Sequence, residues 1–106
     1  GSANEFAVRS LLHADAPMKI LNITGPETVS VKWAAERLGE YLGKAPTYAG
    51  EPSGSAYLNN ASEAMALFGY PAVPIHTLVK WQAEWILSGG RSLGKPTHFE
   101  ERKGSY

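Results

Sequence analysis

The polar stretch near the end of the chain holds the residues best suited to contact a ligand. Residues 95–102 read Lys-Pro-Thr-His-Phe-Glu-Glu-Arg, which combines hydrogen-bond donors with one aromatic ring. Side chains of these types on a loop suit the recognition of a small polar molecule. The predicted substrate-binding set consists of Thr97, His98, Phe99, Arg102 and Tyr57. The alternative for this stretch is a disordered C-terminal end.

Two other sequence patterns resemble functional motifs, but the residues around them do not support the function. Residues 89–95 imitate a phosphate-binding loop, but they follow a predicted helix, and Pro96 stands where a Mg²⁺-binding Ser or Thr is needed. His98, Glu100 and Glu101 could suggest a metal site, but no second histidine lies nearby in the sequence. We therefore assign no metal ligand. The other two histidines are isolated, and we interpret them as surface or boundary residues: His13 and His76.

Composition predicts one small domain that does not bind nucleic acid or an anionic membrane surface. The chain has 106 residues, of which 43% are hydrophobic and 19% charged, as in an ordinary globular protein. Its ten basic and ten acidic residues cancel, so no footprint for nucleic acid or an anionic membrane is present. The absence of cysteine excludes disulfides and fits a reducing compartment. No apolar run is long enough to span a bilayer, and the expected location is cytoplasmic.

The predicted fold is centred on residues 19–24. Ile20, Leu21 and Ile23 form a short apolar run of strand-favouring residues, which the Gly25-Pro26 pair ends. The sequence therefore predicts a buried strand that leads through a turn into a helix.

The helix that follows is predicted from about Val31 to Leu42, where apolar residues recur at three- and four-residue steps. Ser30 suits its N-cap, and Gly43 suits the left-handed residue just after its end. Residues 46–49 read as a second short strand. The predicted class is α/β, a small α+β lobe. It contains a βαβ unit with a short two-stranded parallel sheet, packed by three to four helices.

Three further helices complete the predicted lobe. The first runs from Phe6 to Ala14. The second opens with a capping box, in which Asn60 is the N-cap and Glu63 the third helical residue, and it stops at Gly69. The third runs from about Ile75 to Leu87. Residues 1–6 are set aside as an expression scar, residues 7–94 form the lobe, and residues 95–106 form a tail.

Four stretches of the chain carry a family resemblance. They are residues 22–31 (Asn-Ile-Thr-Gly-Pro-Glu-Thr-Val-Ser-Val), 67–71 (Leu-Phe-Gly-Tyr-Pro), 81–86 (Trp-Gln-Ala-Glu-Trp-Ile) and 94–100 (Gly-Lys-Pro-Thr-His-Phe-Glu). In this order and spacing, the chain resembles the C-terminal, substrate-binding part of extended short-chain dehydrogenases, the NAD-dependent epimerase/dehydratase family.

The resemblance implies an enzyme part that is not catalytic alone. The family's glycine-rich cofactor turn is absent, and Tyr41 and Lys44 are one residue too close for its catalytic pair. No catalytic or cofactor-binding residue is therefore assigned, and NAD or NADP is implied for the parent enzyme. Implied partners are a missing N-terminal Rossmann domain and a small polar substrate. Residues 50–54 are acidic where many relatives carry a phosphate-binding arginine, which speaks against a nucleotide-sugar substrate.

Two functions remain open at this point. The first is the substrate-binding lobe of an NAD(P)-dependent epimerase, dehydratase or reductase, acting on a sugar-like or other polar carbonyl or alcohol substrate. The second is a freestanding binding or dimerisation module of the same fold, with a homo-oligomer as one outcome. Trp81, Trp85 and Tyr41 are expected in the core, unless they face a missing domain and are exposed.

Overall fold

Helices are the regular elements that form along the described chain. The computed structural model describes residues 1–97. In order, these residues form α1 (Ser2–Ser10), the 3-10 turn η1 (Leu11–His13), α2 (Val31–Leu42), α3 (Ser62–Phe68) and α4 (Ile75–Leu87). No strand forms within residues 1–97. The predicted α/β class, with its βαβ unit and two-stranded parallel sheet, is therefore wrong.

The first predicted strand does not form, because its apolar residues pack on helices instead of pairing with a second strand. Leu21 and Ile23 are half-buried against the cluster formed by α1 and α3, while Ile20 is 77% exposed. No backbone hydrogen bond joins residues 19–24 to residues 46–49, both of which the structure describes. A two-stranded sheet has little stability of its own. The apolar run therefore predicts that this segment is partly buried, but it does not predict that the segment pairs with another strand.

The helix α2 matches its predicted bounds at both ends. The Ser30 hydroxyl accepts a hydrogen bond from the backbone N–H of Trp33 at 3.0 Å, which confirms the N-cap. Gly43 has φ +66°, and the Lys44 N–H donates to the Gly39 carbonyl at 3.0 Å. This is the Schellman arrangement, which satisfies carbonyls that the end of a helix leaves unpaired.

The end of α4 repeats this arrangement. Gly89 has φ +75° and donates to the Ile86 carbonyl at 3.0 Å, and Gly90 donates to the Trp85 carbonyl at 2.8 Å. The prediction that Gly89-Gly90 ends the helix is confirmed. A Cβ atom on Gly90 would collide with the Trp85 ring, so the backbone passes directly over that indole.

The start of α3 differs from its prediction. The N-cap is Ala61, and the Asn60 side-chain oxygen accepts from the Ser62 N–H at 2.9 Å. With Ala61 as the N-cap, Glu63 is the second helical residue and no capping box forms; its carboxylate pairs with Lys19 at 3.1 Å. The predicted stop at Gly69 is confirmed, since this glycine has φ +80°.

The helix α1 begins earlier than predicted. It includes residues 2–5, which the sequence analysis set aside, and it continues as η1 to His13. Phe6 is the buried residue of α1, only 4% exposed. Phe6, the last residue of the stretch that was set aside, therefore belongs to the packed core.

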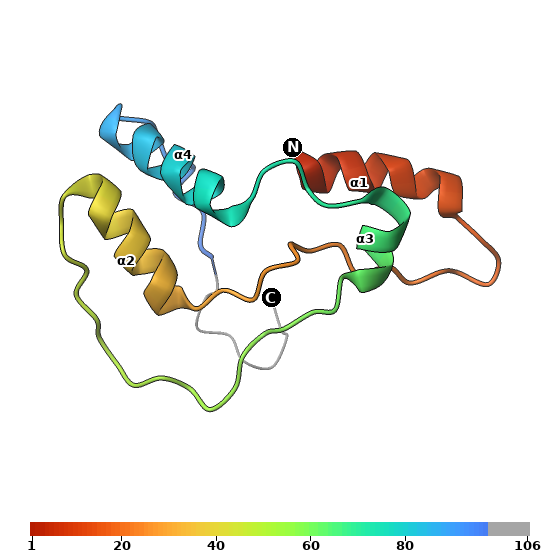
Figure 1. Cartoon of the computed structure of the whole chain (residues 1–106), viewed down its shortest axis with the longest axis horizontal. Helices are drawn as coiled ribbons and strands as arrows, with labels where there is room; N and C mark the ends of the chain where they lie inside the picture. Colours follow the sequence, from red (N-terminus) through yellow and green to blue (C-terminus); the bar gives the residue numbers. More distant parts are fainter. Residues whose placement is uncertain (98–106) are drawn as a thin grey trace.

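The four α-helices are arranged as two pairs (Figure 1). α1 packs on α3, and α2 packs on α4; within residues 1–97 no helix of one pair contacts a helix of the other. The buried face of α4, Val79 and Ala83, therefore faces α2. Trp33 of α2 meets His76 of α4 edge to face at 5.0 Å. Two long connections without regular structure, residues 14–30 and 43–61, and the short segment 69–74 join the pairs. The molecule extends over 50 × 32 × 25 Å.

Candidate functional site

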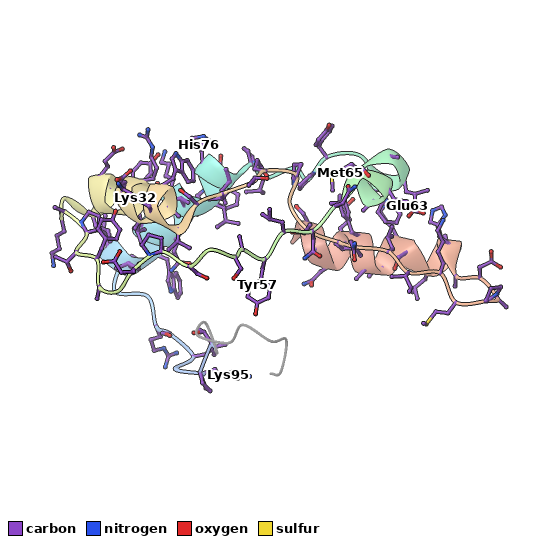
Figure 2. The ribbon with its side chains drawn as sticks, turned by 90° about the horizontal axis from the view of Figure 1, so that it is seen from below. Lys32, Tyr57, Glu63, Met65, His76 and Lys95 are labelled. Carbon is purple, nitrogen blue, oxygen red and sulfur yellow. The ribbon has the colours of Figure 1, made fainter. Side chains whose placement is uncertain are left out.

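The structure places two of the five predicted substrate-binding residues. Thr97 is exposed at the end of the described chain, and Tyr57 is more than half exposed in the connection between α2 and α3. Figure 2 shows the Tyr57 ring pointing away from the helices, on the side of the molecule where Lys95 lies. The other three lie outside the described residues: His98, Phe99 and Arg102. The site in this region therefore stays a prediction.

A pocket of about 330 Å³ lies beside the C-terminal end of α1. It is bounded by η1, by the connection that follows η1, and by one residue of α3. Its apolar wall includes Leu11, Leu21, Ile23 and Leu67, and its polar rim consists of Ser10, His13, Asp15 and Lys19. We call this feature the η1 pocket. Its volume is at the lower end of the range for small-molecule sites.

The packing of α1 on α3 fixes the apolar wall. Phe6 and Phe68 meet with ring centroids 5.3 Å apart and planes tilted by 44°, and fully buried Ala64 lets the two helices approach closely. Arg9 Nη1 donates to the Phe68 carbonyl at 3.1 Å, and the guanidinium lies 5.1 Å from the Phe68 ring centroid. Leu21, Ile23 and Leu67 pack against this cluster, so the wall is continuous with the core.

Two groups on the rim are held in place by α3. The imidazole of His13 meets the Phe68 ring edge to face, with centroids 5.6 Å apart. The Lys19 ammonium pairs with Glu63 at 3.1 Å, and both side chains are about half exposed. An ion pair this exposed contributes little stability, about 0–1 kcal/mol, but it offsets the positive charge beside the pocket.

The remaining rim groups retain unused hydrogen-bonding capacity. The Ser10 hydroxyl donates to the Ala7 carbonyl at 2.7 Å, and one Asp15 carboxylate oxygen accepts from the Ala16 N–H at 2.8 Å. Oxygen lone pairs on both side chains are available for further partners. Because the Ser10 proton is engaged by its own helix, Ser10 and His13 do not form an activated nucleophile–base pair. The arrangement is suited to binding.

Sequence reasoning missed the η1 pocket. It predicts a surface role for His13, a helix break at Asp15 and a strand from Lys19. None of these is a site assignment, because the pocket depends on α3, which follows far along the chain. The one usable sequence signal is the close spacing of His13, Asp15 and Lys19, which all line the pocket.

A second, wide-open depression of about 400 Å³ lies beside the C-terminal end of α2, with Glu36, Glu40 and Lys44 on its rim. Near it, partial desolvation of Tyr48 and, second, the Glu36 carboxylate raise the pKa of the Tyr48 phenol above its usual value. The mixed charges and open shape of this depression give it little ability to select a ligand.

Within residues 1–97, no three His, Cys, Asp or Glu side chains gather closely enough to hold a metal ion. The same part of the chain contains no helix with the length and apolar character needed to cross a bilayer.

Comparison of the chain with models of protein families, with curated proteins and with solved structures found no match in any of the three.

Proposed function

We propose that this chain is the substrate-binding lobe of an NAD(P)-dependent epimerase, dehydratase or reductase. The substrate is a sugar-like or other polar carbonyl or alcohol compound, and the lobe works only beside a cofactor-binding domain. Support for the family is the order and spacing of residues 22–31, 67–71, 81–86 and 94–100. That support does not include a parallel sheet, which is absent from the described residues. Hydride transfer belongs to NAD or NADP and to residues outside this chain.

The main support for the role of a lobe is the large solvent-accessible surface area of the chain. The chain exposes 9019 Å², whereas a folded monomer of its mass exposes about 5,800 Å². Its radius of gyration is 16.6 Å, against about 13 Å for a compact domain of this length. A standard protein interface buries about 1,600 Å² in total. The excess is therefore large enough for an extensive contact with another domain.

Much of this surface is apolar, and it lies both on the helices and on the irregular segments between and after them. Trp81 and Trp85 are 54% and 53% exposed, so the expectation that they belong to the core is wrong. Further exposed apolar residues lie on α1, η1, α2 and the connections: Val8, Leu11, Leu12, Met18, Ile20, Val31 and Leu93. Apolar surface of this extent normally marks an interaction site. A neighbouring domain of the same enzyme would cover it.

Calorimetric titration of the chain with NAD⁺ and NADP⁺ tests this division of labour. We expect no binding by residues 1–106. We also expect the gene upstream of the codon for Phe6 to encode a Rossmann-type glycine-rich turn, and the longer product to bind the dinucleotide. Tight NAD⁺ or NADP⁺ binding by residues 1–106 alone, or a nearby start codon without that turn, would refute the proposal.

One observation favours the alternative of a freestanding binding or dimerisation module. The α2–α4 pair has a side-chain cap at the start of α2 and Schellman ends on both helices, so it carries the local signals of a self-sufficient unit. Size-exclusion chromatography with light scattering separates the two functions. A module of this kind gives a concentration-dependent dimer, whereas a lobe without its domain gives no defined oligomer.

A further inference from the structure

We infer that the η1 pocket binds a small, uncharged compound that has an apolar carbon body and adjacent hydroxyl or carbonyl oxygens. The inference does not depend on the proposed function, because the pocket is built by this chain alone. It also differs from the predicted site around Thr97, since no residue is shared between them.

The size of the pocket and its wall determine the body of the ligand. A volume of about 330 Å³ is too small for a dinucleotide, but it holds a single ring or a short branched chain. Leu21, from the connection after η1, and Leu67, from α3, both line the pocket, and both pack against the cluster around Phe6. A ligand with a hydrocarbon face gains free energy by covering this wall.

The charges on the rim argue against an anionic ligand. The pocket has one lysine and one aspartate on its rim and no arginine. The Lys19 charge is already offset by Glu63 at 3.1 Å, and the Asp15 carboxylate would repel a phosphate or a carboxylate. A site for an anion normally offers arginine forks or several backbone N–H groups. The η1 pocket therefore selects for a neutral compound.

The hydrogen-bonding groups on the rim fit adjacent oxygens. Asp15 can only accept, so it calls for a ligand hydroxyl that donates. Lys19 can only donate, so it calls for a hydroxyl or carbonyl oxygen that accepts. His13 can do either through its ring nitrogens, and its ring is oriented by Phe68. A diol or a hydroxy-ketone satisfies both kinds of partner within one small molecule.

The test is a titration of the full 106-residue chain with trans-cyclohexane-1,2-diol, followed by ¹H–¹⁵N correlation spectra. We expect a dissociation constant in the millimolar range, as for other ligands of this size. Shifts should be confined to residues 10–23 and to Leu67. Cyclohexanecarboxylate should bind at least about tenfold more weakly, because its charge meets Asp15.

The decisive variant is Asp15→Asn, which keeps the oxygen that accepts from the Ala16 N–H and removes the charge. It should weaken diol binding about tenfold. The matched control is Glu51→Gln on an exposed loop outside the pocket, which should leave the affinity unchanged. Far-UV circular dichroism verifies that both variants keep their helices. The absence of shifts, shifts centred on α2 and α4, tighter carboxylate binding, or an unaffected Asp15→Asn variant would each overturn the inference.

Discussion

Gly90 is the residue at which a single methyl group should change the end of α4. A Cβ atom there would overlap the Trp85 ring, whose Nε1 donates to the Arg91 carbonyl at 3.2 Å. Gly90→Ala should therefore displace the indole and lower the free energy of unfolding by about 1 kcal/mol. The measurement is urea denaturation followed by tryptophan fluorescence. Gly54→Ala is the control, because a Cβ on Gly54 meets nothing within 4 Å and no change is expected.

Ser30 supplies the side-chain cap of α2. Its hydroxyl accepts from the Trp33 N–H at 3.0 Å, and alanine cannot replace that bond. Ser30→Ala should lower the free energy of unfolding by about 1 kcal/mol in the same fluorescence experiment. Lys32→Ala, at an exposed position in the first turn of α2 that does not supply the cap, is the comparison. Equal losses in the two variants would show that the cap is not the cause.

The ionisation of the Tyr48 phenol should make the stability of the chain depend on pH. Its pKa is raised, first by partial desolvation and second by the Glu36 carboxylate. On raising the pH, Tyr48 should lose its proton at a higher pH than it does in the unfolded chain, as absorbance near 295 nm would show by difference from Tyr48→Phe. Glu36→Gln should lower this pKa only in part, because desolvation is the larger cause of the shift. The folded chain holds this proton more tightly than the unfolded chain, so stability should decline as the pH rises from the pKa of the unfolded tyrosine toward the raised pKa of the folded one. An unchanged titration in Glu36→Gln would exclude the charge effect.

At the scale of elements, sequence predicted the helices whose signals are local. The bounds of α2 and α4 agree with prediction because Ser30, Gly43 and the Gly89-Gly90 pair act within one turn of the helix ends. The capping box predicted at α3 is absent because the helix begins one residue later than predicted, with Ala61 at its N-cap. Glu63 is close enough to Lys19 to pair with it, and nothing in the local sequence indicates that the two segments meet.

Elements that depend on distant partners were not predictable in the same way. Ile20, Leu21 and Ile23 look like a strand, but a strand needs a neighbour with free backbone groups, and a short apolar run does not specify one. Two of the three residues pack on helices instead. The η1 pocket was missed for the same reason, because α1 and α3 are brought together by the Phe6–Phe68 contact.

The α2–α4 contact depends on a small residue. Ala83 is 1% exposed and lies on the face of α4 that packs on α2. Ala83→Leu should force the helices apart and lower the free energy of unfolding of this pair by about 1–3 kcal/mol, measured by fluorescence in urea. Gln82→Leu, at the neighbouring exposed position of α4, is the control and should change stability by less than about 0.5 kcal/mol. Similar effects from both substitutions would contradict this packing.

At the scale of the whole molecule, the two helix pairs form separate packed units. One contains the Phe6, Ala64 and Phe68 cluster, and the other contains the buried face of α4. Between them run connections with few cross-links, such as the Asn22 side chain donating to the Asn60 carbonyl at 3.5 Å. Weak coupling of this kind allows each unit to unfold at its own free energy.

The positions of the tryptophans make this separation measurable. All three of them, Trp33, Trp81 and Trp85, lie in α2 and α4, whereas far-UV circular dichroism reports the helices of both pairs. We expect urea transitions by fluorescence and by circular dichroism to have different midpoints, because the α1–α3 pair contributes only to the second signal. Phe68→Ala should shift the circular dichroism transition and leave the fluorescence midpoint in place. Coincident transitions in the original chain, or equal shifts of both signals in this variant, would show that the two pairs fold as one cooperative unit.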